Sequence, residues 1–217
     1  MPLPPPNFDR VARIYRWAEY LALGPLLVRT RNHFLPQLTH CRHTLALGDG
    51  DGRFLARLLQ QNPDLHALAV DTSATMLHLL RERCLRPQSN ATTRLQTLQA
   101  SALQAIPATD TDLIVTHFVL DCFHQPEVVA LATRLAAHVA PGTLWLLSDF
   151  ALPSARLLRP LAALYIRALY LAFRVLTGLR TTHLPDPQAA LTQAGFQRIL
   201  RHERLCGLLY TELWQRQ

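Results

Sequence analysis

The sequence predicts a Rossmann-like, doubly wound α/β domain: a seven-stranded, mostly parallel sheet with helices on both faces. Short apolar runs alternate with segments of helical spacing along most of the 217 residues. Glycines at positions 48, 50 and 52 follow the first apolar run, and helical spacing resumes directly after them. The second apolar run ends in Asp71. Open sheets of this class bind nucleotide ligands where such strands end.

Composition indicates one domain in a reducing compartment. The chain is 49% apolar, and its length allows a sizeable core. Its four cysteines show no Cys-x-x-Cys spacing, which is typical of free thiols, and the N-terminus lacks the pattern of a secretion signal. We therefore expect a cytoplasmic, single-domain protein with a helical cap (1–40), a ligand-binding core (41–150), a lid insertion (151–185) and a C-terminal helix and strand pair (186–217).

The N-terminal region predicts two helices. After a proline-rich lead-in, Asn7 is a suitable cap for a helix with apolar spacing that continues to Gly24-Pro25. A second helix is expected from Leu26 to about Leu38. Tyr15 on the first helix suits either an ordinary core position or a ligand contact.

The first strand, residues 44–47, leads into a tight turn with the spacing Gly48-x-Gly50-x-Gly52. Glycine permits positive φ and lets a ligand approach the backbone, while the following helix offers free N–H groups. Arg53 stands where a dinucleotide-binding Gly-x-Gly-x-x-Gly has its last glycine. This favours a nucleoside ligand without a pyrophosphate and disfavours an NAD-dependent oxidoreductase, although a strand-to-helix turn of another α/β protein has the same pattern.

Asp71 ends the second strand, residues 66–70. A carboxylate about 20 residues beyond the glycines is placed to accept both hydroxyls of a ribose. The remaining elements follow in order. Ser73 is a suitable cap for a helix that runs to about Leu85, and a solvated loop over 87–91 follows it. Then come an edge strand over 92–99, a buried strand over 112–118, a helix over 126–140, a strand over 143–150, long and short helices over 157–179 and 186–194, and strands over 196–203 and 208–214.

These patterns together resemble class I S-adenosylmethionine-dependent methyltransferases. Three parts of the chain are similar to the ubiquinone- and menaquinone-biosynthesis C-methyltransferases. They are Phe8-Asp9-x-x-Ala12-x-x-Tyr15, the segment from Asp71 to Leu77, and the C-terminal order of a helix, Ala194-Gly195-Phe196 and two strands. The resemblance covers nearly the whole chain. It implies that the last strand is antiparallel, that the cofactor is S-adenosylmethionine with S-adenosylhomocysteine as product, and that the methyl acceptor is a small molecule.

The resemblance also implies the cofactor contacts. Two positions depart from the family pattern: Ala46 replaces an acid that anchors the methionine end of the cofactor, and Ser101 replaces an aspartate that binds the adenine. Asp49 or Asp51 is the candidate substitute for the first acid. Met76 suits a core position equally well. The full expected set is Tyr15, Gly48, Asp49, Gly50, Asp51, Gly52, Asp71, Thr72, Met76, Ser101, Ala102, Thr116 and His117.

The end of the fourth strand is the expected place of the chemistry. Methyl transfer from a sulfonium is an in-line displacement, and a base is needed only where the acceptor must lose a proton. His117 or Asp121 is the candidate catalytic base, although His117 also suits a core position. We expect no metal site, because His117, Asp121 and His124 lack a ligand spacing.

Residues 157–179 predict a long apolar helix. Arg167 and Arg174 share one of its faces and would lie near the middle of a bilayer, so we do not expect it to span a membrane. A lid over an apolar substrate pocket, a peripheral contact with the inner face of a membrane, and a plain cover for the sheet all remain open. The helix suggests a hydrophobic acceptor, such as an aromatic, quinone-like or lipid molecule.

Two further functions remain as alternatives. The net charge of +7 is compatible with methylation of nucleic acids. However, no Asn/Asp-Pro-Pro-Tyr/Phe motif follows the fourth strand, and no basic tract is interleaved with aromatic residues. We therefore expect no nucleic-acid partner. Ala46 and Ser101 also suit a cofactor-binding protein without catalysis, acting as a partner subunit or a membrane-attached scaffold. The sequence does not indicate the oligomeric state.

Overall fold

A computed structural model describes residues 23–86, 93–153, 155–177, 181 and 183–217. The predicted first helix and Tyr15 lie outside the described residues, as does most of the predicted loop after Leu85. The cofactor contact expected of Tyr15 therefore remains a prediction.

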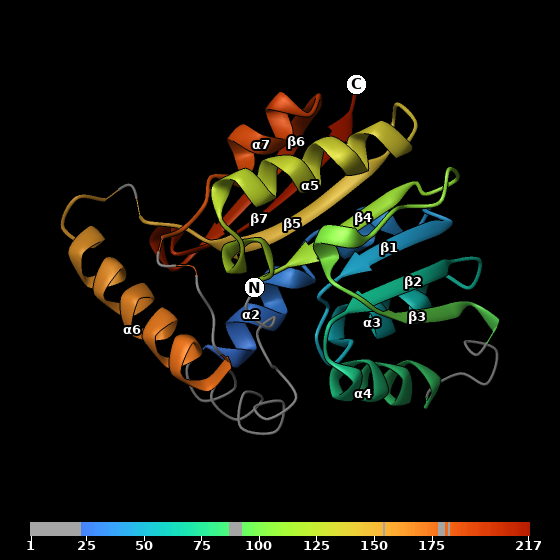
Figure 1. Cartoon of the computed structure of the whole chain (residues 1–217), viewed down its shortest axis with the longest axis horizontal. Coiled ribbons are helices and arrows are strands. Elements are labelled where there is room, and N and C mark those ends of the chain that lie inside the picture. Colours follow the sequence, from blue (N-terminus) through green and yellow to red (C-terminus); the bar gives the residue numbers. More distant parts are fainter. Residues whose placement is uncertain (1–22, 87–92, 154, 178–180, 182) are drawn as a thin grey trace, which may run out of the picture.

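The described residues form a seven-stranded sheet of order β3-β2-β1-β4-β5-β7-β6 (Figure 1). All pairs from β3 to β5 are parallel, while β7 runs antiparallel to both β5 and β6. This confirms the predicted fold class, including the antiparallel last strand. The strands are β1 (His43–Leu47), β2 (His66–Asp71), β3 (Leu95–Gln99), β4 (Leu113–His117), β5 (Leu144–Phe150), β6 (Phe196–Arg204) and β7 (Leu209–Arg216).

Helices pack on both faces because alternate strand residues are apolar on both sides. Ala46 of β1 belongs to the core with α3 (Arg53–Gln61) and α4 (Ala74–Leu85). Its neighbours Leu45 and Leu47 belong to the core with α5 (Gln125–His138) and α7 (Pro187–Gln193). The near-continuous apolar runs of β1 and β4 thus reflect burial on both faces of the sheet.

The predicted helix over 26–38 is wrong in its extent. Helix α2 covers Gly24–Arg31, and a separate 3-10 helix, η1, covers Leu35–Leu38. The side chain of Asn32 donates to the Val28 carbonyl (2.6 Å) at the end of α2. Pro36 lacks the N–H that would donate to the Asn32 carbonyl in one continuous helix, and the Leu35 N–H donates to that carbonyl instead (3.3 Å).

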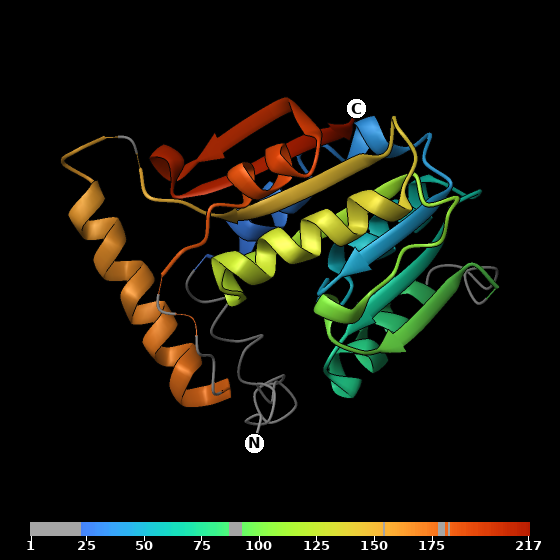
Figure 2. The ribbon, with the colours of Figure 1, turned by 45° about the horizontal axis from the view of Figure 1, so that its top comes forward.

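Helix α6 (Arg159–Thr177) lies at one side of the molecule in both views (Figures 1 and 2). Ile166 and Tyr170 pack against Cys122, Leu184 and Leu208. Within the described part of the chain, no helix has the length and apolar character needed to cross a membrane.

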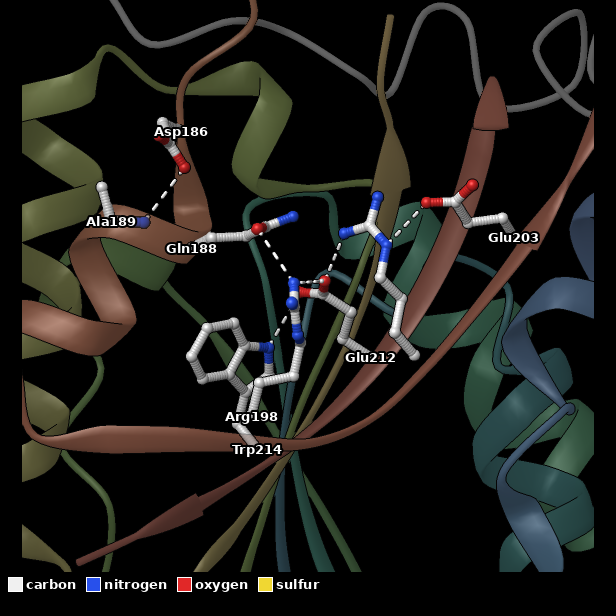
Figure 3. Close-up of polar contacts among 8 residues, drawn as sticks. Asp186, Gln188, Ala189, Arg198, Glu203, Glu212 and Trp214 are labelled. Atoms are coloured by element: carbon white, nitrogen blue, oxygen red, sulfur yellow. Dashed lines mark hydrogen bonds and ion pairs between the residues drawn. The ribbon is translucent and has the colours of Figure 1, made fainter. Parts of the chain in front are cut away.

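A buried carboxylate joins the two antiparallel strands (Figure 3). Glu212 of β7 is fully buried and accepts hydrogen bonds from Arg198 (2.9 Å), from Arg201 and from the indole of Trp214 (2.9 Å). A register shift at Ile199 lies between Arg198 and Arg201 on β6. The extra residue of this bulge places both arginines on the side of the sheet that Glu212 occupies, since residues three apart in a regular strand face opposite sides.

Candidate active site

The ends of the parallel strands meet at one edge of the sheet. Leu47, the last residue of β1, pairs with Val70 of β2 on one side and with Thr116 of β4 on the other. His117 of β4 pairs in turn with Ser148 of β5. The chain order reverses between β1 and β4, which is where open α/β sheets bind their ligands.

The three glycines after β1 all have positive φ, but their surroundings differ. A Cβ on Gly48 would lie 2.6 Å from Val119, and one on Gly52 would lie 2.7 Å from Leu80. A Cβ on Gly50 would have no atom within 4 Å. Packing inside the protein therefore excludes side chains at Gly48 and Gly52, and Gly50 is the glycine whose backbone a ligand can approach.

The two aspartates of this loop have different partners. Asp51 forms ion pairs with Arg53 (3.1 Å) and Arg83 (2.8 Å). Asp49 is buried, and its Oδ2 accepts a hydrogen bond from the Leu55 N–H (3.1 Å) in the first turn of α3. Its Oδ1 has no hydrogen-bond partner among the described residues. Asp49 is thus the better candidate to bind a cationic group of a ligand.

Burial raises the pKa of Asp49 to about 7, because the charged form loses its solvation. The positive charge of Arg31 and the hydrogen bond from Leu55 oppose this increase. A ligand cation beside Asp49 would favour the ionised form in the same way.

Sequence reasoning missed Arg31. It lies in the last turn of α2, is buried, and has its guanidinium 5.1 Å from the ring centre of Phe118. Its charge lowers the pKa of both Asp49 and His117, so it lies close to the ends of β1 and β4. The sequence offers no local pattern that separates Arg31 from the exposed arginines, because burial depends on the tertiary structure.

Asp71 ends β2 beside the glycine loop. Its Oδ1 accepts a hydrogen bond from the Ser73 N–H (2.8 Å), and the Ser73 hydroxyl accepts one from the Met76 N–H (3.1 Å). Ser73 therefore caps α4, as predicted. The Thr72 carbonyl accepts a hydrogen bond from Gln99, and Met76 is buried.

Ser101 lies on the neighbouring strand connection. The Ala100 N–H donates to the Asp71 carbonyl (3.0 Å), so the chain passes Asp71 immediately before Ser101. The Ser101 hydroxyl accepts a hydrogen bond from the Leu103 N–H (3.2 Å) and begins the 3-10 helix η3 (Ala102–Gln104). Its hydroxyl proton can still serve as a donor.

The end of β4 presents two adjacent side chains to opposite faces. The Thr116 hydroxyl accepts a hydrogen bond from the Trp145 indole (2.9 Å) on the α5 side. His117 faces α3, with its Nδ1 3.0 Å from the Ser148 hydroxyl and its ring against Phe54. Burial and the charge of Arg31 hold the pKa of His117 well below its usual value, so this imidazole is neutral at pH 7. The predicted cofactor contacts of Thr116 and His117 remain predictions.

Two buried carboxylates lie beyond β4 and β5. Asp121 belongs to the 3-10 helix η4 (Leu120–Cys122), and its N–H donates to Oδ2 of Asp149 at the end of β5 (3.2 Å). Burial raises the pKa of Asp121 to about 6. Burial and the charge of Asp121 together raise the pKa of Asp149 well above its usual value. This pair can hold one proton near neutral pH and release it to, or take it from, a neighbouring group.

The carboxylate pair lies next to the glycine loop. Val119, two residues before Asp121, is the side chain that closes the space above Gly48. The Tyr170 hydroxyl of α6 donates to the Asp121 carbonyl (3.1 Å) from the other side. Among the residues that the structure describes, no three His, Cys, Asp or Glu side chains are placed to hold a metal ion.

A family model described as "Methyltransferase domain" matches residues 45–144. This region begins in β1 and ends in β5, and it includes the glycine loop, Asp71 and Asp121. A search among curated proteins finds no match.

Several solved methyltransferases have the same fold. Mitomycin 7-O-methyltransferase has 18% identity and a TM-score of 0.68, over 97% of this chain and 61% of that one. An O-methyltransferase family 2 protein from Planctomyces limnophilus, solved in complex with apigenin, has 20% identity and a TM-score of 0.69, over 96% and 62%. N,N-8-amino-8-demethyl-D-riboflavin dimethyltransferase from Streptomyces davawensis has 19% identity and a TM-score of 0.66, over 98% and 62%.

This chain accordingly spans 61–62% of the length of these three proteins. The similarity includes the whole sheet, because nearly all of this chain is aligned in each case. None of the three is a quinone-biosynthesis C-methyltransferase, so that narrower resemblance remains a prediction.

Proposed function

We infer, from the methyltransferase domain matched over residues 45–144, that this chain transfers a methyl group from S-adenosylmethionine to a small, hydrophobic acceptor. The observation that carries this proposal is the loop after β1. Among the described residues, none lies close to a Cβ built on Gly50, so the backbone of the loop is open there, and the loop lies beside Asp71 on the adjacent strand. A nucleoside that lies across the end of β1 would contact both.

The residues present fit the cofactor. The Asp71 carboxylate can accept hydrogen bonds from the two ribose hydroxyls, and Ser101, next to it, can contact the adenine. Asp49 Oδ1, buried without a hydrogen-bond partner, suits the ammonium group of the methionine part. The buried guanidinium of Arg31 suits its carboxylate. Asp49 and Arg31 together would replace the acid that Ala46 lacks.

The bound cofactor would supply a methyl group that is activated for attack by its positive sulfur. The contribution of the chain is to hold the acceptor in line with that methyl group, which can by itself lower the barrier by roughly 7–11 kcal/mol. Asp121 is the better candidate for a base, because the depressed pKa of His117 makes that imidazole a weak proton acceptor. Asp121 would take the proton from an acceptor hydroxyl as the methyl group arrives.

An acceptor with an aromatic hydroxyl agrees best with these features. Phe118 and Phe150 lie at the carboxyl ends of β4 and β5, with ring centres 5.2 Å apart. Phe118 adopts positive φ (54°), which is uncommon for an aromatic residue and is typical of residues held in place at functional sites. The names of the solved relatives, which include a mitomycin 7-O-methyltransferase and a protein in complex with apigenin, also favour O-methylation of a ring system.

The test is transfer of a labelled methyl group. We expect the protein to convert methyl-labelled S-adenosylmethionine to S-adenosylhomocysteine only when a hydrophobic phenol or quinol is present, with the label recovered on that acceptor. Cofactor binding without turnover on any member of such a panel would instead support a non-catalytic cofactor-binding protein. Absence of cofactor binding would contradict the proposal altogether.

Asp121 gives a second prediction, on the pH dependence of the rate. A carboxylate base acts in its deprotonated form, and the pKa of Asp121 is about 6, so kcat/KM should rise with pH between about 5 and 7 and then level off. Asp121→Asn should lower kcat/KM about 100-fold and remove this step. Asp110→Asn, at an exposed carboxylate paired with His43, is the control and should leave the profile unchanged. A profile that is the same in Asp121→Asn would exclude Asp121 as the base.

A further inference from the structure

Helix α6 has two apolar sides, and one of them is packed against the protein. Ala162, Ile166 and Tyr170 follow each other at four-residue intervals and are exposed by only 7%, 6% and 7%. The hydrogen bond from the Tyr170 hydroxyl to the Asp121 carbonyl fixes this side at the carboxyl edge of the sheet. Figures 1 and 2 show α6 at one side of the molecule.

The other side is apolar and exposed. Leu161, Leu164 and Leu171 are exposed by 68%, 65% and 62%, and Ala168 between them is also exposed. At about 100° of rotation per residue, these four residues lie roughly opposite the packed side. We call them the outer face of α6. Contiguous exposed apolar residues of this kind mark interaction sites on proteins.

The charges around the outer face are all of one sign. Arg156, Arg159, Arg167 and Arg174 are exposed, and residues 150–185 contain no aspartate or glutamate. By the same helical rotation, Arg167 and Arg174 lie along one border of the outer face. An apolar strip whose charged neighbours are all arginines is complementary to a partner that has an apolar interior beneath an anionic surface layer.

We propose that the outer face of α6 docks on an anionic membrane surface. The helix would lie in the plane of the bilayer, with Leu161, Leu164 and Leu171 among the upper acyl chains and the arginines extended to the lipid phosphates. This arrangement requires no spanning helix. It also follows from α6 alone and does not depend on methyl transfer.

A second copy of the chain is a poorer partner for the outer face. A two-fold axis brings the same patch of both copies together. The arginines of each α6 would then meet arginines of the other, with no acidic residue in 150–185 to balance them, and like charges brought together oppose association.

Flotation of the purified protein with lipid vesicles tests the proposal. The protein should float with vesicles that contain phosphatidylglycerol and not with vesicles of phosphatidylcholine alone. Arg167→Glu with Arg174→Glu should weaken binding at least about 30-fold, since each basic residue near the surface contributes about 1 kcal/mol and each new carboxylate is repelled by the anionic lipid. Arg57→Glu with Arg81→Glu, at exposed positions of α3 and α4, is the matched control for net charge and should bind nearly as wild type.

The apolar contribution needs its own pair of variants. Leu161→Gln with Leu164→Gln should weaken vesicle binding about tenfold or more, while Leu98→Gln, at a 47% exposed position of the edge strand β3, should not. All four replaced residues of α6 are exposed, and unchanged thermal unfolding would show that the variants fold. Equal flotation with neutral vesicles, or equal binding by the arginine variants, would overturn the proposal. The proposal would also be overturned if the protein bound no vesicles, formed a dimer in sedimentation equilibrium, and lost that dimer in Leu161→Gln with Leu164→Gln.

Discussion

Replacing Asp71 with alanine is expected to weaken binding of S-adenosylmethionine about a thousandfold. The carboxylate is placed to accept two hydrogen bonds from the ribose, and each hydrogen bond to a charged group contributes about 1.5–3 kcal/mol. Calorimetric titration of wild type and Asp71→Ala with S-adenosylmethionine measures the loss. NADH, titrated in parallel, should bind to neither protein, because the spacing of the glycines does not suit a pyrophosphate.

Two further variants separate the ribose contact from the local fold. Asp71 also accepts the hydrogen bond from the Ser73 N–H, and Asp71→Asn keeps an oxygen for that bond while it removes the charge. Its affinity should lie between those of wild type and Asp71→Ala. Ser73→Ala removes the cap of α4 and should cost about 1 kcal/mol of stability with little change in affinity. If Asp71→Ala binds as tightly as wild type, the cofactor does not lie across β1 and β2 as proposed.

Glu212→Ala is expected to lower the free energy of unfolding by about 3–5 kcal/mol, although Glu212 lies away from the candidate active site. The change removes a fully buried carboxylate that accepts hydrogen bonds from Arg198, Arg201 and Trp214. The Trp214 indole N–H would be left buried without an acceptor, and two cations would lose their shared partner. Urea denaturation followed by tryptophan fluorescence or circular dichroism measures the effect.

Glu203 provides the matched control in the same cluster. Its carboxylate also binds Arg201 (2.7 Å), but its side chain is 46% exposed. Water can replace that contact, so Glu203→Ala should change stability by less than about 1 kcal/mol. An equal loss of stability in Glu203→Ala and Glu212→Ala would show that the burial of Glu212 does not determine how much its contacts stabilise the protein.

Much of the glycine loop after β1 was predictable from the sequence. The spacing of the three glycines after an apolar run and the position of Asp71 after the next one are local patterns, and the structure places both at the same edge of the sheet. The cap at Ser73 was predictable for the same reason, because it depends on a hydrogen bond to a residue three positions away. The end of α2 was not predicted correctly, since the sequence alone favoured one helix from Leu26 to about Leu38.

The electrostatics of the site depended on contacts between distant residues. The Asp121 N–H donates to Asp149, 28 residues away. Burial raises the pKa of both carboxyl groups, and the charge of Asp121 raises the pKa of Asp149 further. Arg31 acts on Asp49 and His117 from α2, and no local sequence pattern indicates that this helix packs beside β1 and β4. A local sequence pattern contains no information on contacts between residues that are distant in the sequence.

The sequence by itself determined the seven strands and most of the helices, the three-glycine turn, and the acid at the end of β2, because these follow from the order of neighbouring residues. Only the tertiary structure decided which glycine is open to a ligand, which arginine is buried, and which of the two apolar sides of α6 is covered. The bulge at Ile199, which brings Arg198 and Arg201 to the same carboxylate, belongs to the second group. These properties depend on which elements pack together, and burial of a side chain is set by its neighbours in space rather than in sequence.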